Sequence, residues 1–308
     1  MIRNTKKFIP VMLMPFNLDK SIDYQALRQL IEYYLAAGAE GLFANCLSSE
    51  MFDLSKEEML ASVAFIVEQV GGRVPIVATG TFQEPIPAQA AFVKQIYATG
   101  IDCVIVISSL MASENDSEET FRDNVRQLLA LTENIPLGFY ECPIPYKRLI
   151  QADFLGELVQ AGRVTYHKDT SLQILDVKAK IEAAANYADF GLFDAYMGHA
   201  VETLQAGSAG LSCIQGNYFP ELIVWLCKHY DNPADASKVI RVQQFLSDNM
   251  DVMHYAYPAT AKLFLQKMNL SIGTTIRRTD VEEMDQGVMA NIDKLKIDYD
   301  ELSEVLFN

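Results

Sequence analysis

The sequence predicts an α/β fold, a (β/α)8 TIM barrel with a small C-terminal helical domain. Over the first two thirds of the chain, short apolar runs alternate with longer segments of helical period. Eight such runs occur, the number that the barrel needs. The length of 308 residues accommodates a barrel of about 250 residues with an addition. A doubly wound sheet is the main alternative, but no Gly-x-Gly-x-x-Gly motif follows the first run.

The predicted strands are apolar runs, each followed by a helical pattern. They cover residues 8–14, 41–44, 74–78, 103–107, 137–140, 164–166, 190–193 and 210–213. The first helix follows Asp23, a typical N-cap residue, and ends at Gly38. The second helix begins at the capping box of Ser55 and Glu58.

After Trp225 the strand pattern stops and three helical segments follow, at residues 233–254, 258–268 and 280–296. We therefore expect a catalytic barrel over residues 1–225 and a helical appendix over residues 226–308.

The charge balance excludes one class of partner. With 25 Lys and Arg against 40 Asp and Glu, the net charge is −15, which disfavours nucleic acid and anionic membrane surfaces. It does not exclude a small anionic substrate, because one local lysine can outweigh a distant charge.

The five cysteines are scattered without a Cys-x-x-Cys pair, as in reduced cytoplasmic proteins. We find no signal peptide and no apolar stretch of about 18 residues, and expect a cytoplasmic protein.

Candidate catalytic residues are sought at the carboxyl ends of the strands, where the active sites of such barrels lie. Lys168 follows the sixth run. Its ammonium is expected in the barrel mouth, where desolvation lowers the pKa and leaves a neutral amine that can form a Schiff base. Alternatively, Lys168 pairs with Asp169 or Glu141 and only holds loops together.

Other polar residues follow the neighbouring strands. Tyr140 ends the fifth run, and its phenol can shuttle protons beside a lysine or simply cap a carbonyl at the rim. Ser48 and Ser49 follow the second run, where amides and hydroxyls can hold a carboxylate or form an ordinary turn.

Cysteines and histidines suggest no further chemistry. Cys46, Cys142 and Cys213 fall at strand ends, where we expect them to fill the core. His167 is expected to point away from the lumen, towards the helices, because side chains alternate along a strand. No set of ligands has metal-binding spacing, so we predict no metal and no cofactor.

Four stretches of the sequence resemble the dihydrodipicolinate synthase and N-acetylneuraminate lyase family of Schiff-base-forming enzymes. They are the opening Pro-Val-Met-Leu-Met-Pro-Phe at 10–16, the loop at 41–50 with its continuation at 54–58, the Tyr-Glu-Cys-Pro at 140–143, and the His-Lys-Asp-Thr-Ser at 167–171. In the family, the last two read Tyr-Asn-x-Pro and Lys-(Asp/Glu)-x-Ser, in the same order and at similar spacing.

The resemblance implies roles for five residues. Lys168 would form an imine with a 2-keto acid, and Tyr140 would donate and accept protons. Ser48 would hold the carboxylate with help from the amide of Ser49, and the backbone of Ser212 would face the bound keto acid.

The sequence also departs from the family pattern. Leu47 stands where the synthase has a threonine that relays a proton to the tyrosine. Leu110 and Met111 lie in the segment that carries a tyrosine pair in the synthase. Pro145 occupies the position of an arginine that binds the second substrate. Loss of such a clamp weakens carboxylate binding, which argues against aspartate semialdehyde as the second substrate.

These observations lead to a hypothesis about function. We expect a lyase of the aldolase or dehydratase type that acts on pyruvate or a 2-keto-3-deoxy sugar acid. The alternatives are dihydrodipicolinate synthase itself, with a rebuilt relay, and a catalytically impaired barrel that binds a keto acid. The resemblance also implies a homo-oligomer, a dimer or tetramer.

Overall fold

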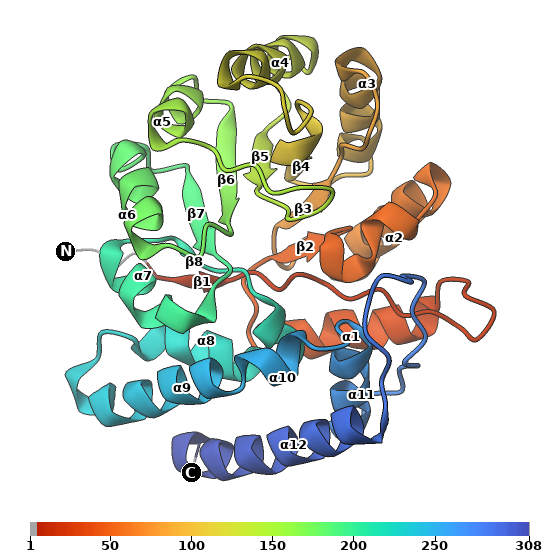
Figure 1. Ribbon diagram of the computed structural model, residues 1–308, viewed down its shortest axis with the longest axis vertical. Helices are drawn as coiled ribbons and strands as arrows, with labels where there is room; N and C mark the ends of the chain where they lie inside the picture. The colour runs from red at the N-terminus through yellow and green to blue at the C-terminus, as the bar shows by residue number, and fades with distance from the viewer. Residues whose placement is uncertain (1–4, 308) are drawn as a thin grey trace.

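The structure, a computed structural model, describes residues 5–307 and has the predicted barrel architecture. Eight parallel strands surround one axis with helices outside them (Figure 1). The strands are β1 (Lys7–Phe8), β2 (Leu42–Ala44), β3 (Ile76–Thr79), β4 (Cys103–Ile107), β5 (Leu137–Tyr140), β6 (Val164–Asp169), β7 (Gly191–Asp194) and β8 (Gly210–Leu211). The helices that follow them are α1 (Tyr24–Ala36), α2 (Lys56–Val70), α3 (Ile86–Tyr97), α4 (Glu118–Leu131), α5 (Ala152–Gln160), α6 (Ile174–Ala183), α7 (Ala200–Ala206) and α8 (Pro220–His229).

The barrel closes between β2 and the segment after β1. The ladder runs β1-β8-β7-β6-β5-β4-β3-β2, and a parallel bridge between Val11 and Phe43 joins its two ends. The predicted strand at residues 8–14 is therefore shorter than expected. Pro10 lies inside the predicted run and has no backbone N–H to donate to a ladder, although its carbonyl accepts a hydrogen bond from Phe43 (3.0 Å).

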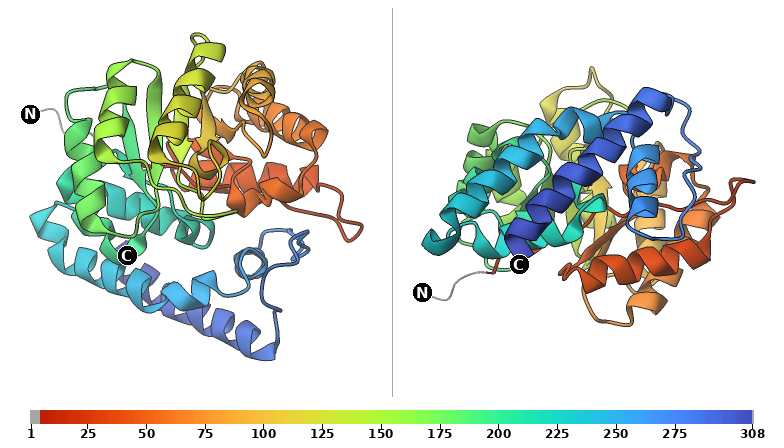
Figure 2. Two further views of the ribbon diagram at one scale, coloured as in Figure 1. Left: turned by 45° about the horizontal axis from the view of Figure 1, so that its top comes forward. Right: turned by 90° about the horizontal axis from the view of Figure 1, so that it is seen from below.

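The C-terminal part of the described chain is helical, and its helices have different bounds from those predicted. It consists of α9 (Ala236–Asp248), α10 (Met250–His254), α11 (Ala259–Lys267) and α12 (Gln286–Phe307). The predicted helix at 280–296 starts later and runs much further, and the predicted 233–254 helix divides at Asn249. The expected division after residue 225 falls inside α8. Helix α9 packs against α7 and α8, and Figure 2 shows the C-terminal helices as a layer on one side of the barrel.

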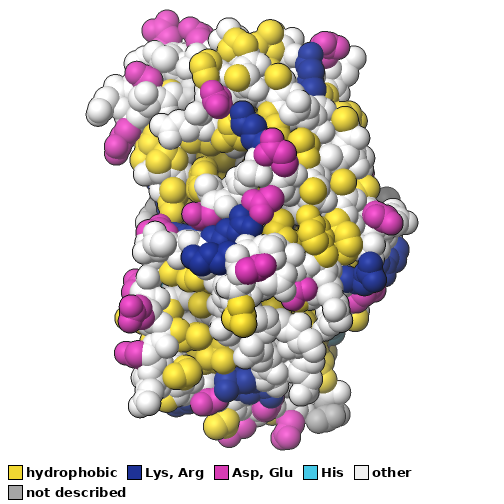
Figure 3. Space-filling view, turned by 90° about the vertical axis from the view of Figure 1, so that its right-hand side faces the viewer, with side chains coloured by type: hydrophobic (Ala, Val, Ile, Leu, Met, Phe, Trp, Pro, Cys, Tyr) yellow, Lys and Arg dark blue, Asp and Glu magenta, His cyan; other side chains and the backbone are white. Residues whose placement is uncertain are grey.

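The C-terminal segment also reaches the loop that follows β2. Buried Lys262, on α11, forms an ion pair with buried Glu50 (3.1 Å). The other carboxylate oxygen of Glu50 accepts hydrogen bonds from the amides of Arg277 and Arg278. In Figure 3, basic side chains gather on this face beside a hollow with hydrophobic side chains. The appendix thus fixes the loop that carries Ser48 and Ser49.

Side-chain alternation produces two apolar cores. One lies between the strands and the helices. The other fills the barrel interior and includes Phe43, Tyr140, Tyr166 and Phe193. The ring of Tyr166 stacks on Phe193 (centroids 4.8 Å apart) and meets Phe43 edge-on, so aromatic rings form the floor beneath the mouth.

No helix in the described part of the chain is long and apolar enough to cross a membrane.

Candidate active site

Lys168 and Tyr140 lie side by side at the carboxyl end of the barrel. Their Cα atoms are register partners on β6 and β5. The Nζ atom of Lys168 lies 4.1 Å from the ring centroid of Tyr140 and 5.8 Å from that of Phe43. Both residues are buried, with 4% and 3% of their surface exposed. The amine and the phenol therefore share one water-poor pocket.

The environment of Lys168 disfavours its charged form. Burial lowers the pKa of Lys168, and the nearby thiols of Cys46, Cys142 and Cys213 offset only part of this effect. Within the described residues, no carboxylate lies within 4.0 Å of its Nζ atom. Glu141 and Asp169, the partners considered in the alternative interpretation, instead bind Lys180.

The cysteines around Lys168 behave as core residues. All five cysteines are free and buried. Burial raises the pKa of Cys142 to about 11 and that of Cys213 to about 12. Both thiols therefore stay protonated near neutral pH and are poor nucleophiles.

The hydroxyl of Tyr140 also stays protonated, because burial raises its pKa well above the ordinary value. Its polar partner is the thiol of Cys142. A protonated phenol beside an attacking amine can donate a proton to the oxygen that leaves the carbon under attack.

Ser48 and Ser49 occupy a short helical turn, Leu47–Ser49, directly after β2. Ser48 is buried, and its hydroxyl forms a hydrogen bond with the phenol of Tyr257. Ser49 instead holds the loop, because its hydroxyl donates to the carbonyl of Met12 (2.6 Å) and its amide to the carbonyl of Cys46 (3.0 Å). The two serines therefore have different surroundings.

Ser212 follows β8 and is fully buried. Its hydroxyl donates to the carbonyl of Ile9 (2.8 Å) and accepts from the phenol of Tyr166 (3.1 Å). Its amide donates to the carbonyl of Asp194 (2.8 Å). These contacts fix the wall of the barrel close to the site.

Tyr257 is a residue that the sequence did not single out. It lies between α10 and α11 and places a phenol beside Ser48. Asn217 donates to its hydroxyl (2.6 Å) and accepts from Tyr34 (2.5 Å). No local signal could have identified Tyr257, because its contacts are with residues far away in the chain.

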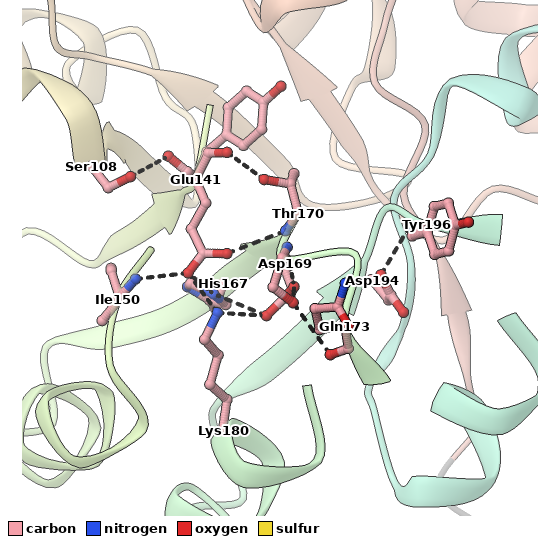
Figure 4. Close-up of polar contacts among 12 residues, drawn as sticks. Ser108, Glu141, Ile150, His167, Asp169, Thr170, Gln173, Lys180, Asp194 and Tyr196 are labelled. Atoms are coloured by element: carbon pink, nitrogen blue, oxygen red, sulfur yellow. Dashed lines mark hydrogen bonds and ion pairs between the residues drawn. The ribbon is translucent and has the colours of Figure 1, made fainter. Parts of the chain in front are cut away.

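His167 points away from the lumen, as predicted, and lies among Glu141, Asp169 and Lys180 (Figure 4). Ligand atoms of Glu141, His167 and Asp169 lie within 4.8 Å of one another, a grouping that sequence spacing did not reveal. The ammonium of Lys180 pairs with both carboxylates (2.5 and 2.7 Å) and supplies the positive charge there.

The segment after Tyr140 has basic side chains, but they bind loop carbonyls. Lys147 donates to the carbonyl of Thr170 (2.8 Å), and Arg148 donates to those of Ser113 and Asp116. Pro145 adds no charge. Next to it, a cavity of about 570 Å³ is lined mainly by apolar side chains, including Met51, Phe82 and Ile144.

Known proteins resemble this chain over almost its full length. The model of the dihydrodipicolinate synthetase family matches residues 4–294. A 4-hydroxy-tetrahydrodipicolinate synthase from Bacillus velezensis is 25% identical over 88% of this chain and 92% of its own. An N-acetylneuraminate lyase from Citrobacter koseri is 25% identical over 68% and 69%. Among solved structures, the Escherichia coli prophage protein YagE in complex with pyruvate, from the dihydrodipicolinic acid synthase family, is 20% identical with a TM-score of 0.84 and coverage of 97% and 98%.

Proposed function

The chain belongs to the dihydrodipicolinate synthetase family and is an aldolase-type lyase, and we propose that it acts on pyruvate or a 2-keto-3-deoxy sugar acid through an imine on Lys168. The observation that supports this most strongly is the buried amine of Lys168, which lies 4.1 Å from the ring of Tyr140. A lowered pKa increases the fraction of neutral, nucleophilic amine, and no carboxylate of the described residues lies within 4.0 Å of it.

The chemistry follows from these two groups. The amine attacks the keto carbon and passes one of its protons to the carbonyl oxygen. Tyr140 donates the second proton, so that this oxygen leaves as water and a phenolate remains. The resulting imine carries a positive nitrogen, which draws electrons from the adjacent bonds. The phenolate then accepts a proton from the next carbon, or it accepts the hydroxyl proton of a sugar acid as the carbon–carbon bond breaks and an aldehyde leaves. Either step gives a neutral enamine. The enamine is then protonated, or it forms a new bond to an aldehyde carbon.

The carboxylate of the keto acid would lie near Ser48. Its hydroxyl forms a hydrogen bond with Tyr257 and can turn to donate to an anion. Ser49 and Ser212 would contribute by shaping the pocket, since their hydroxyls and amides already bind backbone carbonyls. This assigns Ser48 the direct contact and the other two serines a supporting one.

Two features bear on the second substrate. Pro145 provides no cation, and Lys147 and Arg148 are engaged with loop carbonyls. Because the guanidinium of Arg148 already binds loop carbonyls, this segment is a poor match for the carboxylate of aspartate semialdehyde. The main proposal is therefore cleavage or dehydration of a sugar acid. The alternatives are dihydrodipicolinate synthase activity and keto-acid binding without turnover. We also propose a cytoplasmic homo-oligomer, a dimer or tetramer, that needs no cofactor.

The test is exchange at the methyl group of pyruvate. In deuterated water, an enzyme that forms the enamine replaces the methyl protons of pyruvate by deuterium, which proton NMR detects directly. We expect exchange with the wild type and none with Lys168→Met. A panel of 2-keto-3-deoxy sugar acids and of pyruvate with aspartate semialdehyde then identifies the reaction. No exchange and no turnover with any of them would contradict the proposal, while exchange without turnover would favour the binding protein.

A further inference from the structure

A buried ionic cluster lies directly outside the barrel wall, between β5, β6 and helix α6. It contains the carboxylates of Glu141 and Asp169 and the ammonium of Lys180, and no side chain among the three is more than 3% exposed. The Nζ atom of Lys180 lies 2.5 Å from Glu141 and 2.7 Å from Asp169. Figure 4 shows the three side chains converging from two strand ends and one helix.

The two carboxylates are the direct chain neighbours of the proposed catalytic pair. Glu141 follows Tyr140, and Asp169 follows Lys168. Successive side chains on a strand point to opposite faces. The phenol and the amine therefore enter the lumen, while the carboxylates leave on the outer side and meet at Lys180. One ammonium thus connects the two strand ends that carry the reacting groups.

The hydrogen bonds of the cluster reinforce this connection. Glu141 accepts from the amides of Ile150 (2.8 Å) and Thr170 (3.2 Å), and the hydroxyl of Thr170 donates to the carbonyl of Glu141. Asp169 accepts from the amide and hydroxyl of Ser171 (2.7 and 2.6 Å). Each carboxylate oxygen of Glu141 and Asp169 therefore has a polar partner.

The charges keep the cluster ionised. Burial alone would raise the pKa of Glu141, but the neighbouring His167 and Lys180 lower it to about 2. Burial acts to lower the pKa of Lys180, while Glu141 and Asp169 raise it. The Nε2 atom of fully buried His167 lies 3.5 Å from Glu141 and 3.8 Å from Asp169.

We propose that Lys180 is a positioning residue for the Lys168–Tyr140 pair. By binding Glu141 and Asp169 together, it fixes the ends of β5 and β6 relative to each other and so sets the approach of the phenol to the amine. This inference rests on the imine chemistry proposed above. A misplacement of about 1 Å can cost a reaction about a hundredfold in rate, so the connection matters for catalysis.

The test compares variants of the full chain by trapping with pyruvate and borohydride. Lys180→Met should lower the maximal trapping rate at Lys168 by about tenfold to a hundredfold, with a much smaller change in the half-saturating pyruvate concentration. The matched control is Lys178→Met, on the same helix, which removes an exposed ion pair with Glu202 (2.7 Å). The control should behave as the wild type.

A second variant separates positioning from stability. Lys180→Met combined with Glu141→Gln keeps the net charge of the cluster but removes the connection. It should fold and show the same loss of trapping rate, measured well below its unfolding midpoint. Wild-type trapping in this double variant would overturn the inference.

A second reagent distinguishes failure of this inference from failure of the proposed function. Reductive methylation of Lys168 by formaldehyde and cyanoborohydride reports its reactivity without a keto acid. If the wild type forms no pyruvate adduct, the proposed imine chemistry is wrong. The methylation rates of Lys168 still test whether Lys180 positions it. Equal methylation rates of Lys168 in the wild type and both Lys180 variants would overturn the positioning role of Lys180. A severalfold change in rate that is absent from Lys178→Met would support this role.

Discussion

The amine of Lys168 lies 4.1 Å from the ring centroid of Tyr140, within the register pair that joins β5 to β6. The contact places a lysine with a lowered pKa against a phenol with a raised one. Both shifts act in the direction that imine formation requires, towards a neutral amine and a phenol that keeps its proton.

Replacement of Lys168 by methionine should abolish turnover and leave a stable protein. We expect a loss of at least about a thousandfold in kcat, because methionine has no amine to form the imine. Methionine also fills the space without a buried polar group, so the free energy of unfolding should not fall. Denaturant titration and steady-state kinetics check both statements. A destabilised but active variant would assign the residue a structural role.

The same variant should change how stability depends on pH. The folded pKa of Lys168 lies below its ordinary value of 10.5. Between these two values the unfolded chain binds the additional proton, so the free energy of unfolding of the wild type rises with pH in this window. Lys168→Met lacks this contribution and should show a smaller rise, measured by urea unfolding at several pH values. An equal rise in both proteins would contradict the lowered pKa.

Removal of the Tyr140 hydroxyl should affect catalysis more than binding. Tyr140→Phe keeps the ring against Lys168 but cannot donate a proton. We expect kcat to fall by about a hundredfold to ten-thousandfold, while the half-saturating concentration of keto acid changes little. Steady-state kinetics on the identified substrate measures both quantities. An unchanged kcat would mean that a group other than Tyr140 transfers the proton.

Tyr257→Phe tests whether the appendix completes the keto-acid site. The change removes the hydroxyl that binds Asn217 and Ser48. We expect weaker keto-acid binding and a loss of about 1 kcal/mol in the free energy of unfolding. The matched control is Tyr255→Phe. Tyr255 lies two positions before Tyr257 in the chain and is 48% exposed. Calorimetry measures keto-acid affinity, and urea unfolding measures the free energy of unfolding. Equal effects of the two substitutions on both quantities would show that Tyr257 has no specific role in the keto-acid site.

The fold was predictable because its signals are local. Eight apolar runs and their helical intervals lie in the order of the chain, and period-two alternation was enough to separate the inward Lys168 from the outward His167. The strand at 8–14 was overestimated, because an apolar run does not show whether each residue finds a ladder partner. Pro10 cannot donate to one.

The site was only partly predictable, because much of it depends on contacts between distant segments. Lys180 contacts Glu141 across 39 positions, and Tyr257 meets Asn217 across 40. An ordinary lysine on an amphipathic helix and a tyrosine between two helices carry no local sign of these partners. The carboxylates next to Lys168 also suggested a pairing that the fold assigns to Lys180.

The most direct measurement is peptide mass spectrometry after incubation with pyruvate and borohydride. We predict a reduced pyruvate adduct on Lys168 alone, and none on Lys262, a second buried lysine whose ammonium is paired with Glu50. An unmodified Lys168 at saturating pyruvate, with any 2-keto-3-deoxy sugar acid equally unreactive, would contradict it.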